Sequence, residues 1–139
     1  VLRVAGIYGP GRGHLFQRFM RGEAALAGNG ERILNMIHLE DLVEIIIASL
    51  EKADPGQILN VADDEPVSER QFYEWLAART GKKFPESMPE EEFKKRKRGL
   101  TSKRVQNARL KNSLNYQFRF PTYRGGYERE LARWSAGQE

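Results

Sequence analysis

A glycine-rich turn near the start of the sequence is the first stretch whose residue types suggest chemistry. Residues 9–13 are Gly-Pro-Gly-Arg-Gly, and they stand between an apolar run and an amphipathic segment. Such a turn at a helix N-terminus can present backbone N–H groups to an anion, and Arg12 could add a bidentate contact to phosphate or carboxylate. The spacing satisfies neither G-x-G-x-x-G nor the P-loop, which needs Lys-Ser/Thr where Arg12-Gly13 stands. A ligand-facing turn and a plain strand-to-helix turn both remain open.

Histidine and carboxylate residues form two further candidate groups. His38 and Asp41 lie three residues apart at a helix start, but a catalytic pair there would need a nucleophile. We expect instead that His38 makes a structural hydrogen bond and that Asp41 favours the helix dipole. Residues 63–65 (Asp-Asp-Glu) could bind a hard cation, although a solvated turn is the favoured interpretation. Because His14 is the only other histidine, a histidine-rich metal site is excluded, and no metal ligand is predicted.

Composition and charge exclude several classes of protein. The 139 residues make one domain with a net charge of +4, and no cysteine is present for a disulfide, a thiolate metal site or a nucleophile. No apolar run is long enough to span a membrane, and we expect a cytoplasmic location without a membrane partner. The basic run over 94–98 could contact nucleic acid, but no aromatic residues interleave with it. A solvated charged segment is therefore favoured.

The elements that would position these residues alternate between strands and helices. Apolar, partly β-branched runs predict strands, and apolar residues three and four apart predict helices. The expected elements are a buried strand over 1–9, a helix over 14–26, an extended segment over 29–39, a helix over 40–53, a strand over 56–63, a helix over 67–81, an irregular charged segment over 82–102, a helix over 108–114, a short strand or extended piece over 116–121 and a last helix from 123. This order indicates an α/β layer with some parallel strands, too few for a closed sheet.

The sequence also predicts which helix faces are apolar and where helices end. Ser68 and Gln71 have the spacing of a capping box, and Gly81 suits the end of the same helix. Asn107 can cap the helix over 108–114. The apolar stripe of the helix over 40–53 comprises Leu42, Val43, Ile46 and Leu50. The aromatic residues expected in or beside the core are Phe72, Tyr73 and Trp75.

Four stretches, taken together, resemble the C-terminal half of an extended short-chain dehydrogenase/reductase, in the NAD(P)-dependent epimerase/dehydratase family. They are LRVAGIYGPGR (2–12), NMIHLEDLVEIIIASLE (35–51), GQILNVADDEPVSERQFYEWLA (56–77) and SKRVQNARLKNSLNYQFRFPTYRGGYE (102–128). The last stretch is similar to the tail of an atypical subgroup of the family. The resemblance implies an α/β fold in which residues 1–139 form the last strands of a Rossmann-like sheet and the small substrate-binding lobe. It also implies that the N-terminal dinucleotide-binding half is absent.

The resemblance assigns a small set of site residues. Val4 and Ala5 match positions that line the nicotinamide, and Gly6, Tyr8 and Arg12 match the turn that faces the substrate. No catalytic residue is carried over, because no tyrosine of this chain is followed by lysine in the family's Tyr-x-x-x-Lys spacing. In the family that pair relays the proton and holds the ribose. We therefore expect NAD or NADP in a full-length parent, and no tight dinucleotide binding by this chain.

One departure from the family pattern bears on the substrate. Nucleotide-sugar members usually carry an arginine shortly before the histidine of their I-H motif, and here Leu34 and Asn35 stand at those positions. A diphosphate-sugar substrate is accordingly not favoured.

Three functions follow from these patterns and this resemblance. The main prediction is a substrate-lobe fragment of an NAD(P)-dependent oxidoreductase, inactive alone, whose parent acts on a small molecule. The first alternative is a non-catalytic binding or assembly module, with self-association through the sheet edge that missing strands leave exposed. The second alternative is nucleic-acid binding through residues 94–104, which is least favoured because no helix-turn-helix, zinc or aromatic-platform signature accompanies the charge.

Overall fold

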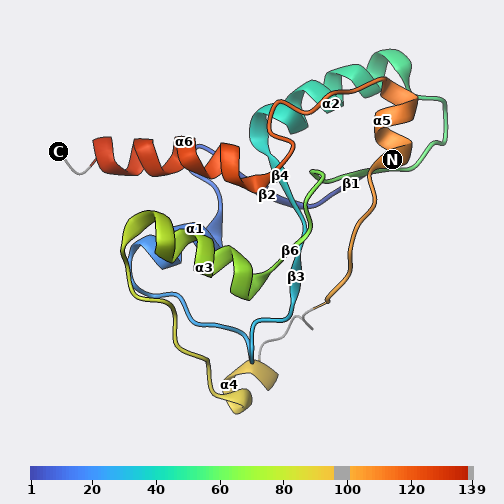
Figure 1. The fold of residues 1–139 in the computed structure, drawn as a ribbon. Helices are drawn as coiled ribbons and strands as arrows, with labels where there is room; N and C mark the ends of the chain where they lie inside the picture. The colour runs from blue at the N-terminus through green and yellow to red at the C-terminus, as the bar shows by residue number, and fades with distance from the viewer. Residues whose placement is uncertain (96–100, 138–139) are drawn as a thin grey trace. The chain divides into compact units, whose positions relative to one another are not determined.

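A computed structural model describes residues 1–95 and 101–137 of the chain (Figure 1). The fold is mixed α/β, as the alternation of sequence patterns predicts. Among the described residues the elements, in chain order, are β1 (Leu2–Val4), β2 (Gly6–Tyr8), α1 (His14–Met20), β3 (Ile33–Leu34), β4 (Met36–His38), α2 (Leu39–Lys52), β5 (Leu59–Val61), β6 (Val67–Ser68), α3 (Glu69–Thr80), α4 (Glu90–Lys94), α5 (Ala108–Leu114) and α6 (Tyr123–Ala136).

The chain divides into two compact units. Unit 1 comprises Val1–Gly13, Asn35–Glu65 and Val105–Glu139, and unit 2 comprises His14–Leu34 and Pro66–Arg104. Each unit is assembled from segments that are far apart in the sequence. The glycine-rich turn and all five predicted site residues belong to unit 1.

Unit 1 is built on two parallel strand pairs, β1 with β5 and β2 with β4. The change of partner occurs at Ala5, whose N–H donates to Val61 O at 3.0 Å, while the N–H of Gly6 donates to Asn35 O at 3.1 Å. The single buried strand predicted over 1–9 is therefore wrong in two respects. The run is divided into two strands, and all three residues of β1 are exposed or half-buried because only β5 pairs with it among the described residues.

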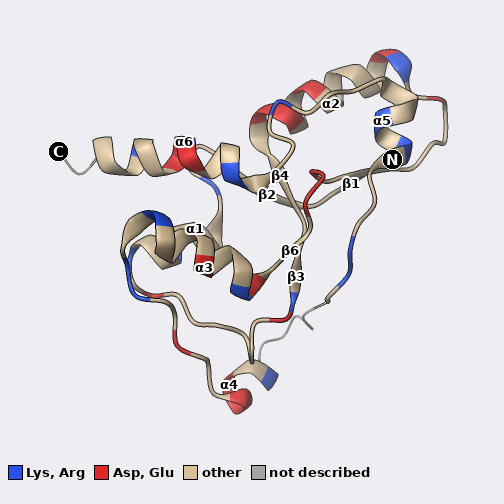
Figure 2. Ribbon diagram, in the orientation of Figure 1, with Lys and Arg blue, Asp and Glu red and all other residues tan. Residues whose placement is uncertain are grey.

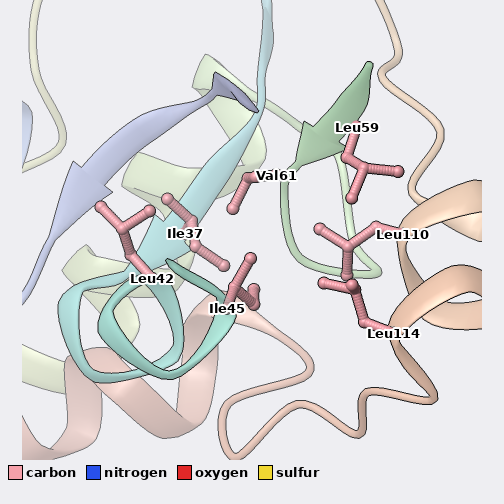
Figure 3. Packing of buried hydrophobic residues seen from close by; sticks show 7 residues of the cluster. All are labelled: Ile37, Leu42, Ile45, Leu59, Val61, Leu110 and Leu114. Atoms are coloured by element: carbon pink, nitrogen blue, oxygen red, sulfur yellow. The ribbon is translucent and has the colours of Figure 1, made fainter. Parts of the chain in front are cut away.

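The hydrophobic core of unit 1 lies where β4, α2, β5 and α5 meet (Figure 3). Its buried side chains are Ile37, Leu42, Ile45, Leu59, Val61, Leu110 and Leu114. These residues come from three distant segments, so the core joins the strands to both helices. The helices predicted over 40–53 and 108–114, and the one predicted from 123, are confirmed as α2, α5 and α6.

The buried face of α2 differs from the predicted stripe. Leu42 and Ile45 are buried, together with Asp41. The remaining members of the predicted stripe, which are exposed, are Val43, Ile46 and Leu50. Apolar residues cover more than one face of α2, and spacing alone does not show which face meets the core. The stripe prediction is therefore wrong except at Leu42.

Asn107 precedes α5 but does not cap it. Its side-chain amide donates to Ala62 O at 2.9 Å and to Asp64 Oδ1 at 2.8 Å, and it makes no capping hydrogen bond to α5. The predicted cap is wrong because this amide is used to hold the chain that follows β5. Asn107, a residue type that is typical of helix caps, thus makes long-range hydrogen bonds instead.

Unit 2 contains the antiparallel pair β3–β6 with α1, α3 and α4. The predicted capping box is confirmed: Ser68 Oγ accepts from the N–H of Gln71 at 3.1 Å, and Gln71 Oε1 accepts from the N–H of Ser68 at 3.4 Å. Gly81 ends α3 with φ of 69°, a left-handed conformation that suits glycine. Phe72 and Tyr73 are buried, as predicted.

Two predictions in unit 2 fail in detail. The helix predicted over 14–26 ends at Met20, because Gly22 adopts φ of 74° and its N–H donates to Phe19 O at 3.0 Å. The irregular segment predicted over 82–102 contains the short helix α4. Most of the basic run lies outside the described residues. No helix among the described residues is long and apolar enough to cross a membrane.

Candidate functional site

The glycine-rich turn after β2 is explained largely by backbone geometry. Gly9, Gly11 and Gly13 all have positive φ, at 131°, 69° and 99°. The N–H of Arg12 donates to Gly9 O at 2.9 Å and closes the turn. L-residues rarely adopt such angles, so three glycines are required whether or not a ligand binds. The strand-to-helix turn is therefore present, and its ligand-facing role remains a prediction.

A cluster of four rings, which we call the ring cluster, packs beside this turn. It comprises Tyr8, His38, Phe120 and Tyr127. Tyr8 stacks on Tyr127 with ring centroids 4.3 Å apart and meets His38 edge-on at 5.2 Å. A Cβ atom at Gly126 would collide with the Tyr8 hydroxyl, so the first turn of α6 can approach the cluster only with glycine there. Tyr8 is thereby held in a buried position.

His38 and Asp41 both act as structural anchors. His38 Nδ1 accepts from the N–H of Glu40 at 3.2 Å at the start of α2, which confirms the predicted structural hydrogen bond. The Asp41 carboxylate is fully buried and accepts from the Tyr116 hydroxyl and the Arg119 N–H, both at 2.7 Å, and from the Phe120 N–H at 2.9 Å. The segment over 116–121, which was predicted to be a short strand or extended piece, is therefore held by hydrogen bonds to Asp41. It does not pair with a strand among the described residues. The role of Asp41 is larger than the dipole effect predicted for it.

The three acidic residues after β5 do not form the solvated turn predicted for them. Asp64 pairs with Lys111 at 2.8 Å and accepts from Asn107, while Glu65 pairs with Arg124. Asp63 is almost completely buried. The three side chains therefore point to different partners. Among the described residues no group of three carboxylate or histidine side chains could hold a metal ion.

Asp63 introduces an unusual protonation state into unit 1. Its Oδ1 accepts from the Glu65 N–H at 3.0 Å, while Oδ2 has no hydrogen-bond partner among the described residues. Burial, opposed by the Glu65 hydrogen bond and reinforced by the charges of Glu65 and Asp64, raises the pKa of Asp63 to about 7. A carboxyl group with such a pKa exchanges its proton near neutral pH.

Two members of the ring cluster, His38 and Tyr8, favour their uncharged forms. Burial lowers the pKa of His38, and burial together with the charge of Asp63 raises the pKa of Tyr8 above its ordinary value. His38 Nε2 and Tyr8 Oη, like Asp63 Oδ2, have no hydrogen-bond partner in the part of the chain that the structure describes. Sequence reasoning missed this polar interior, because its members come from β2, β4 and the chain after β5.

The predicted site residues occupy two different environments. Val4, Ala5 and Gly6 lie together where the chain changes from pairing with β5 to pairing with β4, and Val4 is 43% exposed. Carboxyl ends of parallel strands are where open α/β sheets bind ligands. Arg12 is exposed on the turn, whereas Tyr8 is 1% exposed within the ring cluster. Their ligand contacts remain predictions.

Unit 2 contains an open pocket that the sequence did not indicate. Its volume is about 450 Å³, and it lies between the end of α1 and the chain that follows α3. The lining residues are Phe19, Gly22, Ala24, Lys82, Lys83, Phe84, Pro85 and Glu86. Lys83 pairs with Glu86 at 2.6 Å on this lining. Aromatic and basic side chains together suit a ligand that has an apolar part and an anionic group.

Comparison with known proteins identifies the kind of domain to which this arrangement corresponds. No protein-family model matches the chain. A conserved protein of unknown function from Silicibacter pomeroyi is 34% identical, with a TM-score of 0.78, and the match covers 96% of this chain and 48% of that one. A putative NAD-dependent epimerase/dehydratase from Methylobacillus flagellatus is 30% identical, with a TM-score of 0.68 over 96% of this chain and 46% of that one.

More distant structures with a bound dinucleotide share the fold. Human epimerase family protein SDR39U1 with NADPH is 23% identical and has a TM-score of 0.71, over 88% of this chain and 44% of that one. MoeE5 in complex with UDP-glucose and NAD is 21% identical and has a TM-score of 0.72, over 97% of this chain and 47% of that one. Structural relatives of this chain therefore bind NAD or NADPH.

A curated relative also matches most of this chain. Protein YeeZ of Escherichia coli is 29% identical over 121 residues, which are 87% of this chain and 40% of YeeZ. The chain thus spans less than half the length of this relative and about half the length of the solved structures. The predicted resemblance is confirmed as a partial match to NAD(P)-dependent epimerase/dehydratase structures of the extended short-chain dehydrogenase/reductase type. The mixed α/β fold corresponds to about half of these Rossmann-type structures.

Proposed function

We propose that this chain is the C-terminal, substrate-lobe portion of a cytoplasmic NAD(P)-dependent oxidoreductase of the epimerase/dehydratase type. One observation carries the proposal. The match extends over nearly the whole of this chain at 30–34% identity, yet over less than half of the related structures. A chain built in this way would supply part of a site whose remaining parts lie in the other half of the relatives. Residues 1–139 would then form a single portion of one domain.

The roles proposed for the individual residues of unit 1 are those that the resemblance to the family implies. Val4 and Ala5 would form a wall beside the nicotinamide at the end of β1, and Gly6 and Arg12 would face the substrate. The buried Tyr8 would support that wall from within the ring cluster. Bound NAD or NADP would supply the hydride chemistry. The proton relay and the grip on the phosphates would come from residues outside this chain, which has no Tyr-x-x-x-Lys.

Calorimetric titration of the isolated chain with NAD and with NADP tests this proposal. We expect no binding tighter than about 1 µM, because only the nicotinamide wall is present and most of the contacts that fix a dinucleotide are not. Oxidoreductase activity should also be undetectable. Sub-micromolar binding of either dinucleotide would contradict the proposal, since it would require a complete site within these residues.

A non-catalytic assembly module is the second candidate. The observation that favours it is the amount of apolar surface that unit 1 leaves exposed, on α2, on β1 and before β5. Exposed apolar patches commonly mark interaction sites. On this view the surface would bind another protein segment and the lobe would do no chemistry.

A further inference from the structure

The open pocket of unit 2 is made by residues that the proposed function does not use. The chain contributes to its lining twice, at Phe19, Gly22 and Ala24 and again over residues 82–86. All of these residues belong to unit 2, whereas the five predicted site residues belong to unit 1. A volume of about 450 Å³ is sufficient for a small organic molecule. The pocket is therefore a second candidate binding site.

Two aromatic side chains of the lining are held in place by contacts of their own. Phe19 is 3% exposed, and its ring stacks on Tyr73 with the ring centroids 5.7 Å apart. Phe84 is half-buried, and the Arg70 guanidinium lies over its ring, 5.5 Å from the centroid. Side chains that are already fixed lose little conformational freedom when a ligand binds. The apolar part of the pocket is thus preformed, and aromatic walls suit a flat apolar ring.

The charged side chains of the lining leave one cation uncompensated. Two lysines and then a glutamate follow α3 along the chain (Figure 2). Lys83 Nζ pairs with Glu86 Oε1 at 2.6 Å, whereas Lys82 makes no ion pair among the described residues. Two positive charges and one negative charge give the lining a net charge of +1. The pocket therefore favours an anion, with Lys82 as its partner.

The same charges favour a carboxylate over a phosphate. A phosphate monoester carries a charge of about −1.5 to −2 at neutral pH, and a carboxylate carries a single negative charge. The net charge of the lining balances only the single charge, and Glu86 would repel a second one. A monoanion is accordingly the better match.

We propose that this pocket binds a small aromatic carboxylate. Its ring packs against Phe19 and Phe84, and its carboxylate pairs with the Lys82 ammonium. The inference does not rest on the proposed function, because neither a dinucleotide nor any residue of unit 1 takes part.

The test is a titration of the isotope-labelled chain with phenylacetate at constant ionic strength, followed by the NMR shifts of the backbone amides. We expect saturable shifts centred on Gly22, Ala24 and residues 82–86. The dissociation constant should be about 1–10 mM, which is typical of a ligand with about ten heavy atoms. Phenylacetamide, which has the same shape without the charge, should bind at least about threefold more weakly. Acetate, which lacks the ring, should give no saturable shift at these residues.

Lys82→Glu reverses the charge that pairs with the carboxylate. It should weaken phenylacetate binding at least about fivefold and leave phenylacetamide binding unchanged, a combination that a loss of structure would not give. Lys95→Glu is the matched control. Lys95 is also an exposed lysine of unit 2 that follows the end of a helix, but it does not line the pocket. Its replacement should change neither affinity.

Glu86→Gln should act in the opposite direction. It removes the negative charge from the lining and releases Lys83 to the ligand, so phenylacetate should bind at least about twofold more tightly. Phenyl phosphate should gain more than phenylacetate, because its additional charge no longer meets Glu86. A gain in affinity cannot result from unfolding.

Three results would overturn the inference. Equal affinities for phenylacetate and phenylacetamide would mean that charge has no part in binding. Equal effects of Lys82→Glu and Lys95→Glu, or shifts centred outside the lining, would place the ligand elsewhere. Tighter binding of phenyl phosphate than of phenylacetate by the unsubstituted chain would make the ligand a phosphate monoester and not a carboxylate.

Discussion

Unit 1 and unit 2 bury their apolar residues to very different extents. All seven large apolar side chains that are exposed among the described residues belong to unit 1, and none belongs to unit 2. Yet unit 1 has the parallel strands, which are the elements that most need to be covered. The large apolar residues of unit 2 that the structure describes are buried or half-buried. Among the described residues, large apolar side chains are therefore left exposed on unit 1 and not on unit 2, which fits the proposal that unit 1 binds a partner.

The buried polar groups differ in the same way. Unit 2 uses the Glu69 carboxylate for one hydrogen bond, which it accepts from the Ala27 N–H at 3.0 Å. In unit 1 the buried Asp41 carboxylate accepts the hydrogen bonds that hold residues 116–121. The Asp63 Oδ2 atom of the same unit has no hydrogen-bond partner among the described residues. Buried polar groups are costly when unpaired. Unit 1 should therefore be the less stable of the two and the more sensitive to substitution and to pH.

The largest effect is expected from Asp41→Ala in unit 1. Three donors would lose their acceptor, and each buried donor left without a partner costs about 1–3 kcal/mol, so we expect a loss of about 3–5 kcal/mol. The measurement is urea unfolding in two single-tryptophan backgrounds. Trp134 on α6 reports on unit 1, and Trp75 on α3 reports on unit 2. The Trp134 transition should move further than the Trp75 transition.

Asp41→Asn is the control for this experiment. It keeps one carbonyl oxygen as an acceptor and should recover part of the loss. Equal shifts of the two tryptophan transitions would mean that the units unfold together, and the proposed difference in stability would then be wrong.

A matched pair of core substitutions should give the next largest effects. Leu110 in unit 1 and Leu76 in unit 2 are both fully buried on helices. Replacing a buried leucine by alanine costs about 2–5 kcal/mol, and we expect about 3 kcal/mol in each case. Only Leu110→Ala should also increase the binding of a hydrophobic dye in native conditions, because it loosens the unit that already exposes apolar surface. Equal dye binding by both variants would remove this distinction between the units.

Asp63 should give unit 1 a distinct dependence of stability on pH. Because its pKa is raised to about 7, the folded state holds a proton that the unfolded state releases near pH 4, so this contribution to stability is lost as pH rises from about 4 through about 7. Asp63→Asn should therefore gain about 2–3 kcal/mol relative to the unsubstituted chain between about pH 5 and about pH 8. The measurement is the difference in the free energy of unfolding between the two proteins, obtained from urea unfolding at each pH.

Taking the difference between the two proteins is essential here, because His38 titrates in the opposite sense. Its lowered pKa removes stability as pH falls, and this contribution is common to both proteins. The ionisable groups that act on the Asp63 site, from the elements packed around it, are Tyr8, Asp41, Asp64 and Glu65. A pH-independent difference between Asp63→Asn and the unsubstituted chain would show that Asp63 is ionised throughout this range.

Local signals in the sequence were sufficient for much of the fold. The capping box of Ser68 and Gln71, the ending at Gly81 and the helix that became α2 all depend on residues within one or two turns of each other. Such features are set by short-range geometry and can be predicted from spacing. The resemblance to epimerase/dehydratase proteins was likewise carried by short motifs in the correct order.

The predictions from the sequence that were wrong all depend on long-range packing. The sequence shows that α2 is apolar on several sides, but only the placement of α5 decides that Ile45 is buried and Ile46 is not. Asn107 has the residue type of a cap, yet Ala62 and Asp64 use its amide instead. Nothing in residues 116–121 indicates that a carboxylate 75 positions earlier holds them. The polar interior around Asp63 could not be predicted for the same reason.

The smallest effect is expected at the capping box of unit 2, where a local prediction can be measured directly. Ser68→Ala removes the side-chain acceptor of the Gln71 N–H and should cost about 1 kcal/mol, seen as a shift of the Trp75 transition. Ser68→Thr keeps the hydroxyl and should restore most of the loss, which separates the cap from simple loss of packing. Asn107→Ala, at the predicted cap that the structure uses for long-range contacts, should move the Trp134 transition instead. If Ser68→Ala moved the Trp134 transition as far as the Trp75 transition, the cap would not be a property of unit 2 alone.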